Sequence, residues 1–549
     1  MIKRTTKAII AAMFVTAGLA GPTVSQAIAQ GEPNAAIPRI EAKNGKHRLI
    51  VDGKPFLILG AQVNNSTYST AVLPQVWSVA HDIGINTLEA PIPWEQLEPE
   101  EGRFDFDYVD ALISQARAND VRLVLLWFGG WKNGGATYAP AWVRTDTRRF
   151  PRQVGRDGVI TRGLSPFGRA TIDADKRAFL RLMRHLRETD PQNTVILIQV
   201  ENETGTWNGP RDYSPAAENA FKGQVPVALA RALHKPQGTW TEAFGVDADR
   251  SFAAWALARM VDEVAAAGAA EKGLPMYTNA AASNPFNPAQ GAPFASGGPD
   301  WNSIDVWKVT APNLSFVSPD IYIPVPAIYG KLLDYYARPD NALMIPETSN
   351  EGQVSRFVWL ALGKGAIGFS PFGVDATQHA NFPKGYGSMI LGATQAYGAK
   401  FNLLKPIASD WARIAFDHPT WGAVQDDKNT TQTTTMGRWR ITTWFGAPEY
   451  GPPPKDGSAM ADPKQLDGGS LVAQLSADEF LVTGSSSRVQ IELAAPRKGE
   501  LGEYLSVEEG TFVNGAWMTR RTRNGDQVDW NLNFGESPFL LRVRMHSVR

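Results

Sequence analysis

The chain has 549 residues, of which 43% are hydrophobic and 20% are charged, so it is long enough for more than one domain and too apolar for a disordered protein. Its 54 basic and 55 acidic residues nearly cancel, which argues against a protein whose main task is to bind the phosphate backbone of nucleic acid. The sequence contains no cysteine, which excludes disulfides, iron–sulfur clusters and thiol nucleophiles within it.

Residues 1–29 have the three parts of a secretory signal peptide. A positively charged start is followed by an apolar run over residues 8–21 and by Ala27-Ile28-Ala29, which has the small-x-small pattern of a cleavage site. The apolar run is shorter than the roughly 20 residues that span a bilayer, and a membrane anchor that stays attached is the alternative. We therefore expect export to the periplasm or the extracellular space, with no membrane span in the mature chain.

Residues 30–404 are predicted to form a (β/α)8 barrel. Short runs rich in aliphatic and aromatic residues alternate there with longer amphipathic stretches, and the number of runs, eight, is the number that such a barrel needs. The predicted strands are 56–62, 86–92, 122–128, 194–203, 276–279, 315–322, 342–347 and 365–370. Helix-like stretches between them include 104–119, 173–188, 252–267 and 353–362. A doubly wound open sheet is the structural alternative.

Residues 405–549 are predicted to form a second, β-rich domain that resembles a β-sandwich. Apolar and polar residues alternate here, and Asn514-Gly515 and Asn524-Gly525 are turn signals. The alternating segments are 438–444, 470–475, 480–484, 488–493, 504–507 and 528–533. The stretch 452–469 is rich in Pro, Gly, Asp and Lys, which predicts a long exposed loop.

Two of the predicted barrel strands end in glutamates. The fourth ends in Glu201-Asn202-Glu203 and the seventh in Glu347, and the carboxyl ends of all barrel strands meet at one face. In an ideal strand, Glu201 and Glu203 point to the same side and Asn202 to the other. Such a pair suits glycoside hydrolysis, and two full-length Glu side chains favour the short separation of a retaining enzyme. A salt bridge on a loop is the alternative for either Glu alone.

The residues around these glutamates resemble a known group. The runs 199–205 and 345–347 are similar to the acid/base and nucleophile strands of retaining β-glycosidases with a (β/α)8 barrel. Trp94-Glu95-Gln96-Leu97-Glu98-Pro99, Gly102-Arg103-Phe104-Asp105-Phe106 and the run 48–56 resemble glycoside hydrolase family 35, mainly β-galactosidases. The resemblance covers residues 45–400. It implies that Glu203 is the acid/base, that Glu347 is the nucleophile and that Asn202 binds the sugar 2-hydroxyl.

The chain departs from the family at positions that contact galactose. Many members have Tyr where Pro91 stands and an Ala-Glu pair where Gly129-Gly130 stands. The sequence Trp-Phe-Gly-x-Trp-Lys-Asn over residues 127–133 resembles a bacterial branch of the family in which some members act on xyloglucan side chains. The resemblance therefore makes Trp131, Lys132 and Asn133 candidate sugar contacts, with loop packing as the alternative.

Other strand ends carry weaker candidates. The resemblance implies that Tyr322, at the end of the sixth strand, donates a hydrogen bond to the nucleophile, whereas a core tyrosine is the alternative. Asn279 ends the fifth strand and is predicted to contact the sugar or to cap a turn. Gln62 and Asn64 are similar but weaker candidates, and Trp207 is either a sugar platform or a core residue.

We therefore predict an exo-acting retaining β-galactosidase that acts on β-galactoside-containing oligo- or polysaccharides, with no metal or organic cofactor and no nucleic-acid partner. The histidines lack zinc-ligand spacing and the sequence lacks a Gly-x-Ser-x-Gly elbow. Residues 363–368 match Gly-x-Gly-x-x-Gly, but they lead from a helix into a strand, the reverse of a dinucleotide-binding turn. The alternatives are a β-glucosidase or β-xylosidase on the same barrel, or a non-catalytic carbohydrate-binding protein.

Overall fold

The computed structural model describes residues 35–549 except for 208, 288–294, 378–390, 428–430 and 446–466. The predicted signal peptide, residues 1–29, and residues 452–466 of the predicted loop lie outside the described residues. Among the helices that the structure describes, none combines the length and the hydropathy that crossing a bilayer requires.

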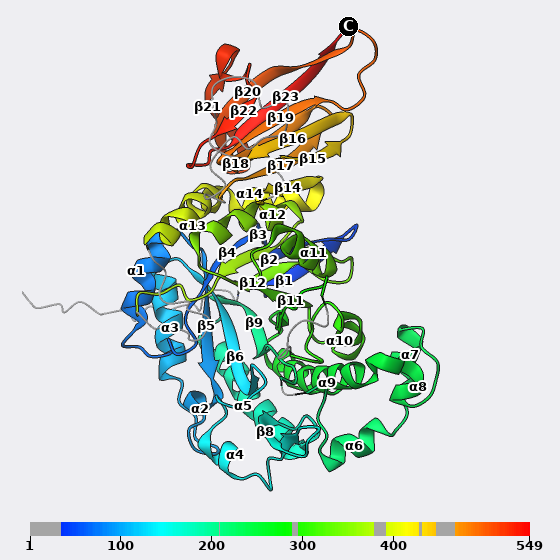
Figure 1. Ribbon diagram of the computed structural model, residues 1–549. Coiled ribbons are helices and arrows are strands. Elements are labelled where there is room, and N and C mark those ends of the chain that lie inside the picture. Colours follow the sequence, from blue (N-terminus) through cyan, green and yellow to red (C-terminus); the bar gives the residue numbers. More distant parts are fainter. Residues whose placement is uncertain (1–34, 208, 288–294, 378–390, 428–430, 446–466) are drawn as a thin grey trace, which may run out of the picture. The chain divides into compact units, whose positions relative to one another are not determined.

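Eight parallel strands form a closed barrel (Figure 1). They are β4 (Ile58–Gln62), β5 (Thr87–Pro93), β6 (Arg122–Lys132), β9 (Val195–Asn202), β10 (Met276–Ala281), β11 (Phe316–Ile321), β12 (Met344–Thr348) and β13 (Gly368–Pro371). Each pairs with its neighbour in chain order, and β13 returns to β4 through Gly368 opposite Ile58. The predicted (β/α)8 barrel is confirmed and the open-sheet alternative is wrong, because this last pairing closes the sheet.

Helices connect the barrel strands. They are α1 (Leu73–Ile83), α3 (Asp107–Ala118), α5 (Arg169–Thr189), α9 (Ala248–Glu271), α10 (Ile304–Thr310), α11 (Pro326–Tyr336), α12 (Phe357–Gly363) and α13 (Leu391–Leu404). Residues of β6 alternate between two cores: Val124 and Phe128 pack in a cluster drawn from the barrel strands themselves, whereas Leu123 and Trp127 pack in the cluster shared with the helices. This alternation explains why the strands read as continuous apolar runs.

The longer insertions lie in the loops that follow strands β5, β6 and β9, and therefore at the carboxyl ends of the strands. They contain α2 (Trp94–Leu97), α4 (Ala141–Thr145), β7 (Arg152–Val154), β8 (Ile160–Leu164), α6 (Pro215–Phe221), α7 (Val227–Ala232), α8 (Trp240–Phe244) and the 3-10 turn η1 (Gly245–Asp247). A further 3-10 turn, η2 (Gly352–Arg356), follows β12. This is the face on which barrel enzymes carry their active sites.

An antiparallel sheet that the sequence did not predict precedes the barrel. It consists of β1 (Arg39–Lys43), β2 (Lys46–Val51) and β3 (Lys54–Phe56). Asp52 and Gly53 have φ values of 51° and 74°, which suit the tight turn between β2 and β3. Leu49 and Val51 belong to the core inside the barrel, next to Ile58, so this sheet closes the end of the barrel opposite the candidate site.

The C-terminal part of the chain consists mainly of two antiparallel sheets, which confirms the predicted β-rich, sandwich-like region (Figure 1). One has the order β14-β17-β18-β23-β20-β21 and the other β15-β16-β19-β22. Their bounds are β14 (Thr420–Val424), β15 (Thr431–Met436), β16 (Trp439–Phe445), β17 (Gly469–Ser476), β18 (Glu479–Ser485), β19 (Ser487–Leu493), β20 (Leu501–Val513), β21 (Ala516–Arg523), β22 (Leu532–Phe534) and β23 (Leu541–Val548). Trp439 and Ile441 from one sheet and Val472 and Val482 from the other share a core.

The two turn signals of this region have different outcomes. Asn514 and Gly515 have φ values of 51° and 80° and join β20 to β21 as the sequence predicts. Asn524 is extended, and Gly525 begins the 3-10 turn η4 (Gly525–Gln527) instead of a hairpin. The predicted domain limits, 30–404 and 405–549, stay predictions; η3 (Lys405–Ile407) and α14 (Ala408–Asp417) lie between the last barrel helix and the first strand of the sheets.

Candidate active site

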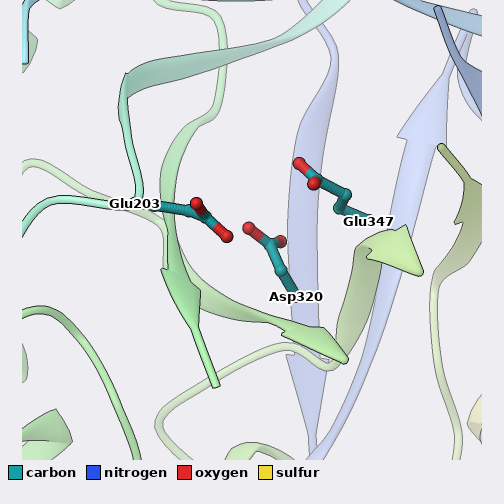
Figure 2. A group of neighbouring side chains, drawn as sticks. All are labelled: Glu203, Asp320 and Glu347. Atoms are coloured by element: carbon teal, nitrogen blue, oxygen red, sulfur yellow. The ribbon is translucent and has the colours of Figure 1, made fainter. Parts of the chain in front are cut away.

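Glu203 and Glu347 lie together at the carboxyl ends of their strands. Glu203 directly follows β9 and Glu347 is the penultimate residue of β12. Both are nearly buried, with 2% and 6% of their surface exposed. One oxygen from each of these carboxyl groups and one from Asp320 lie within 4.8 Å of one another, and Figure 2 shows Asp320 between the two glutamates. The topology of the barrel therefore joins two carboxyl groups that are far apart in the chain.

The end of β9 does not continue as an ideal strand. Glu201 and Glu203 have positive φ values of 61° and 43°, which are uncommon for residues other than glycine. Because of this twist, Glu203 lies beside Asp320, whereas Glu201 lies beside Asp175 of α5, on the helix side of the barrel. The expectation that Glu201 and Glu203 point to the same side is therefore wrong.

Glu201 and Asp175 form a buried carboxyl pair. Glu201 Oε2 accepts a hydrogen bond from the Trp131 backbone N–H at 2.7 Å. Asp175 Oδ1 accepts from Trp127 Nε1 at 2.8 Å, and its Oδ2 accepts from the Gly130 N–H at 2.8 Å. Burial raises the pKa of both carboxyl groups, and the Asp175 charge raises the pKa of Glu201 further. A proton held by Glu201 removes the repulsion between them.

This pair explains why glycine stands at positions 129 and 130. A Cβ atom on Gly129 would lie 2.6 Å from Glu201 Oε1 and 2.7 Å from Asp175 Oδ1. A Cβ atom on Gly130 would lie 3.0 Å from Asp175 Oδ2. The carboxyl pair therefore fills the space that larger side chains would need at these two positions.

Two side chains hold the carboxyl group of Glu347. The Tyr322 hydroxyl donates a short hydrogen bond to Glu347 Oε1, and Gln62 Nε2 donates to Oε2 at 3.1 Å. Burial and the Glu347 charge raise the pKa of Tyr322 well above its ordinary value, so its hydroxyl keeps the proton that it donates. The structure thus brings together Tyr322, which the resemblance placed here, and Gln62, a weaker candidate.

Asn279 connects the Glu203 side of the site with Asp320. Its Oδ1 accepts from the Glu203 backbone N–H at 2.9 Å, and its Nδ2 donates to Asp320 Oδ2 at 2.6 Å. The Asn202 side-chain amide lies 3.1 Å from Asn279, 2.9 Å from Asn133 Oδ1 and 2.7 Å from Lys132 Nζ. Asn202 and Asn279 therefore lie where the sequence predicts them, and their roles stay predictions.

Asp320 is a site residue that was not predicted from the sequence. It lies on β11, pairs in register with Glu347 on β12 and is 1% exposed. Burial, followed by the charges of Glu347 and Glu203, raises its pKa well above the ordinary value. A signal existed in the sequence: Asp320 stands two residues before Tyr322, so strand alternation places both on the same face.

Glu89 on β5 was also missed. It is fully buried in the barrel interior, where Ser370 Oγ donates to its Oε1 at 2.5 Å and the Tyr277 hydroxyl donates to its Oε2 at 3.5 Å. Burial and the charge of Glu347 raise its pKa to about 8. Glu89 is therefore protonated at neutral pH and adds no second charge near Glu347.

The candidate sugar contacts at the end of the third strand lie in different places. Trp131 is fully buried in the helix-side core, in the same cluster as Trp127, so its ring does not lie with the site carboxyl groups. Lys132 and Asn133 lie beside Asn202 instead. Trp207 is partly exposed and packs against Gly134, where a Cβ atom would lie 2.0 Å from its Cδ1.

The oxygens of Glu203, Asp320 and Glu347 have a spacing that can also hold a divalent cation. Lys132 places a positive charge beside Asp320, and Asn279 and Tyr322 already donate to two of the three groups. These neighbours favour protons and hydrogen bonds over a cation as the means of relieving the repulsion.

Comparisons with known proteins concern part of the barrel and the C-terminal region. Residues 68–253 match the family model described as Beta-galactosidase, that of glycoside hydrolase family 42. The β-galactosidase of Xanthomonas manihotis is 26% identical over 183 residues, which are 31% of this chain and 27% of that protein. Beta-galactosidase-1-like protein 3 of Homo sapiens is 27% identical over 199 residues, or 34% of this chain and 28% of that protein. The matches thus span little more than a quarter of the length of these relatives.

Two further comparisons concern the fold and the C-terminal region. The crystal structure of the β-galactosidase from the psychrophilic Marinomonas ef1 has a TM-score of 0.50 with this chain at 13% identity, over 66% of this chain and 62% of that one. Residues 397–535 match a family model described as a domain of unknown function, DUF5597. Residues 68–253 are therefore similar in sequence to β-galactosidases of the family 42 type, and the barrel is similar in fold to a solved β-galactosidase.

Proposed function

We propose that the chain is an exo-acting retaining glycoside hydrolase that removes terminal β-galactosyl residues from oligo- or polysaccharides. The observation that carries the proposal is the approach of Glu203 and Glu347, whose carboxyl oxygens lie within 4.8 Å. Retaining glycosidases hold their two carboxyl groups about 5–5.5 Å apart, whereas inverting ones need about 6.5–9.5 Å to admit a water molecule. The shorter separation supports direct attack by one carboxylate.

In this mechanism Glu203 protonates the glycosidic oxygen while Glu347 attacks the anomeric carbon, so that the bond to the leaving group breaks as the glycosyl-enzyme ester forms. Glu203, now ionised, then takes a proton from the water that cleaves the ester. The hydrogen bonds from Tyr322 and Gln62 orient the Glu347 carboxylate before the attack. Asn202 binds the sugar 2-hydroxyl in this proposal.

The finer part of the proposal concerns the family branch and the substrate. The motif over residues 94–106 supports a relationship to family 35, and the residues 127–133 support the branch that contains xyloglucan-active β-galactosidases. Lys132 and Asn133, which lie beside Asn202, would replace the galactose contacts that are lost at Gly129-Gly130. The galactosyl specificity itself is supported by the names of the relatives that match residues in the barrel.

A panel of 4-nitrophenyl glycosides tests this function. We expect the highest kcat/KM on the β-galactoside, and proton NMR should detect β-galactose as the first product. A higher kcat/KM on the β-glucoside or β-xyloside would contradict the sugar specificity and favour the corresponding enzyme. Absence of turnover on every glycoside, together with binding to insoluble polysaccharide, would favour a non-catalytic binding protein. α-Galactose as the first product would contradict the nucleophile role of Glu347.

We also propose that the protein is exported and that cleavage follows Ala29, on the basis of the pattern in residues 1–29. Mass spectrometry of the protein secreted by its native host should find Gln30 at the N-terminus. Soluble protein that retains Met1 would contradict this proposal.

A further inference from the structure

Asp320 is the central member of the three carboxyl groups, and the reaction proposed above gives it no role. One oxygen of Asp320 lies within 4.8 Å of an oxygen of Glu203 and of an oxygen of Glu347, which themselves approach within the same limit (Figure 2). Asp320 is 1% exposed, so water does not screen these contacts. Three ionised carboxyl groups at this separation would repel one another strongly.

The two oxygens of Asp320 have different surroundings. Oδ2 accepts from Asn279 Nδ2 at 2.6 Å. Oδ1 is buried and accepts no hydrogen bond from an N–H or hydroxyl group of the described residues, and Asp320 shares a side-chain hydrogen bond with the carboxyl group of Glu203. A buried carboxylate oxygen without a donor is costly, whereas a carboxyl oxygen that carries its own proton can donate to the carboxylate beside it. The geometry therefore favours a proton on Oδ1.

The charges around Asp320 also favour a proton on this residue. Burial and the neighbouring carboxylates raise the pKa of Asp320, and Lys132 supplies a positive charge that lowers it only in part. Three tyrosines also interact electrostatically with it, and burial raises the pKa of each well above its ordinary value, so they remain neutral. The titratable groups that interact with Asp320 are Glu203, Glu347, Lys132, Tyr277, Tyr322 and Tyr336.

We propose that Asp320 is a positioning residue that stays protonated throughout the reaction and donates a hydrogen bond to whichever of Glu203 and Glu347 is ionised. This proposal rests on the roles proposed above for those two residues. In the resting enzyme Glu347 is ionised and Glu203 is protonated. In the glycosyl-enzyme Glu347 is an ester and Glu203 is ionised. The group of three therefore carries one negative charge in both states, opposite the one positive charge of Lys132, and only the direction of the Asp320 hydrogen bond changes.

Two substitutions separate a neutral donor from an ionised carboxylate at this position. Asp320→Asn keeps a neutral donor of the same shape, whereas Asp320→Ala removes the donor. We expect the Asn variant to keep kcat within about tenfold of the wild type and the Ala variant to lose about 10²–10³-fold, as for the loss of one oriented donor. Asp334→Asn, on the exposed surface of α11, is the matched control and should leave kcat unchanged.

The pH profile of kcat/KM shows whether Asp320 is neutral or ionised. A neutral donor stabilises ionised Glu203, so its loss in Asp320→Ala should move the alkaline limb upward by about one pH unit, and Asp320→Asn should leave it in place. An ionised Asp320 would instead raise the pKa of Glu203, so both variants would move the limb downward. A downward shift, or a wild-type kcat and profile in Asp320→Ala, would overturn the proposal.

An infrared difference spectrum tests the proton without turnover. Wild type minus Asp320→Asn, at pH 7 and without substrate, should contain the C=O band of a protonated carboxyl group, and labelling with ¹³C-aspartate should shift it. If this band is absent, the proposal fails whatever the activity. If the band is present but the wild type hydrolyses no glycoside, the proposed function fails and the proton on Asp320 is nevertheless established.

Discussion

Two groups of buried carboxyl residues lie at the end of β9, one on each side of the barrel wall. Glu203, Asp320 and Glu347 come from three elements and converge inside the barrel mouth, where side-chain donors and Lys132 surround them. Glu201 and Asp175 lie on the helix side, where two backbone N–H groups and Trp127 hold them.

Burial raises the pKa of carboxyl groups on both sides, so a raised pKa by itself does not mark an active site. The difference lies mainly in convergence, because three elements bring their carboxyl groups together at the mouth. Exposure separates only Glu347, at 6%, from the other four residues, which are 0–2% exposed. We infer that the group at the mouth acts on substrate and that the helix-side pair fixes the end of β6, where Lys132 and Asn133 lie. The predictions below test whether the two groups have these different roles.

The largest effect is expected at the nucleophile. Glu347→Ala should lower kcat on the order of 10⁵-fold, because the covalent step loses its attacking group, and should leave the protein folded. Azide should restore turnover by attacking from the vacated side, with the α-galactosyl azide as product. Near wild-type turnover in the folded variant would remove Glu347 from the mechanism.

Glu203→Ala should have a smaller effect that depends on the substrate. With a poor leaving group the loss should be about 10²–10⁴-fold, which is typical of a missing general acid, whereas a nitrophenyl leaving group needs less protonation. Azide should now accelerate the second step and yield the β-galactosyl azide. An α-azide from this variant would show that the two roles are reversed.

The sequence predicts the features that depend on continuous burial. All eight barrel strands were predictable because fully buried strands are uninterrupted apolar runs, and Glu203 and Glu347 were predictable because each follows such a run. Asp320 was missed because it lies inside the run 315–322, whereas the candidate residues were predicted from the ends of such runs. The side of Glu201 was wrong because two positive φ values, which single-sequence alternation does not indicate, turn the end of β9.

Elements outside the apolar runs were also missed. β1 and most of β21 are exposed, so they lack the buried face that makes a strand recognisable. The carboxyl pair of Glu201 and Asp175 joins a strand end to a helix 26 positions earlier in the chain, and nothing in the local sequence of Asp175 indicates that contact. Such contacts arise only when the barrel is assembled.

The helix-side pair can be tested through its packing. Gly129→Ala should destabilise the protein by about 1–3 kcal/mol, because the new Cβ would overlap the Glu201 and Asp175 oxygens at 2.6 and 2.7 Å and Trp127 Nε1, which donates to Asp175, at 2.4 Å. Gly135→Ala is the matched control, since its nearest neighbour would be an ordinary contact at 3.7 Å. Chemical denaturation measures both. Equal stabilities of the two variants would show that the Glu201 and Asp175 side chains can shift to accommodate the new Cβ without loss of stability.

The smallest effect is expected for Glu201→Gln. The same substitution two residues later, Glu203→Gln, is the comparison. Burial and Asp175 raise the folded-state pKa of Glu201 above 4.5, so its stabilising contribution is present below that pH and is lost as the pH rises through the folded-state pKa. Glutamine keeps an acceptor for the Trp131 N–H and a donor for Asp175 but does not titrate.

Glu201→Gln should therefore match the wild-type Tm at pH 5 and exceed it by about 2–4 °C at pH 8. Its kcat should stay within about threefold of the wild type, since Glu201 touches no reacting atom. Glu203→Gln should abolish general-acid catalysis whatever its Tm. Parallel curves of Tm against pH for Glu201→Gln and wild type would mean that Glu201 is already ionised in the folded protein, and a large loss of kcat in Glu201→Gln would end the division between the two sides of the barrel wall.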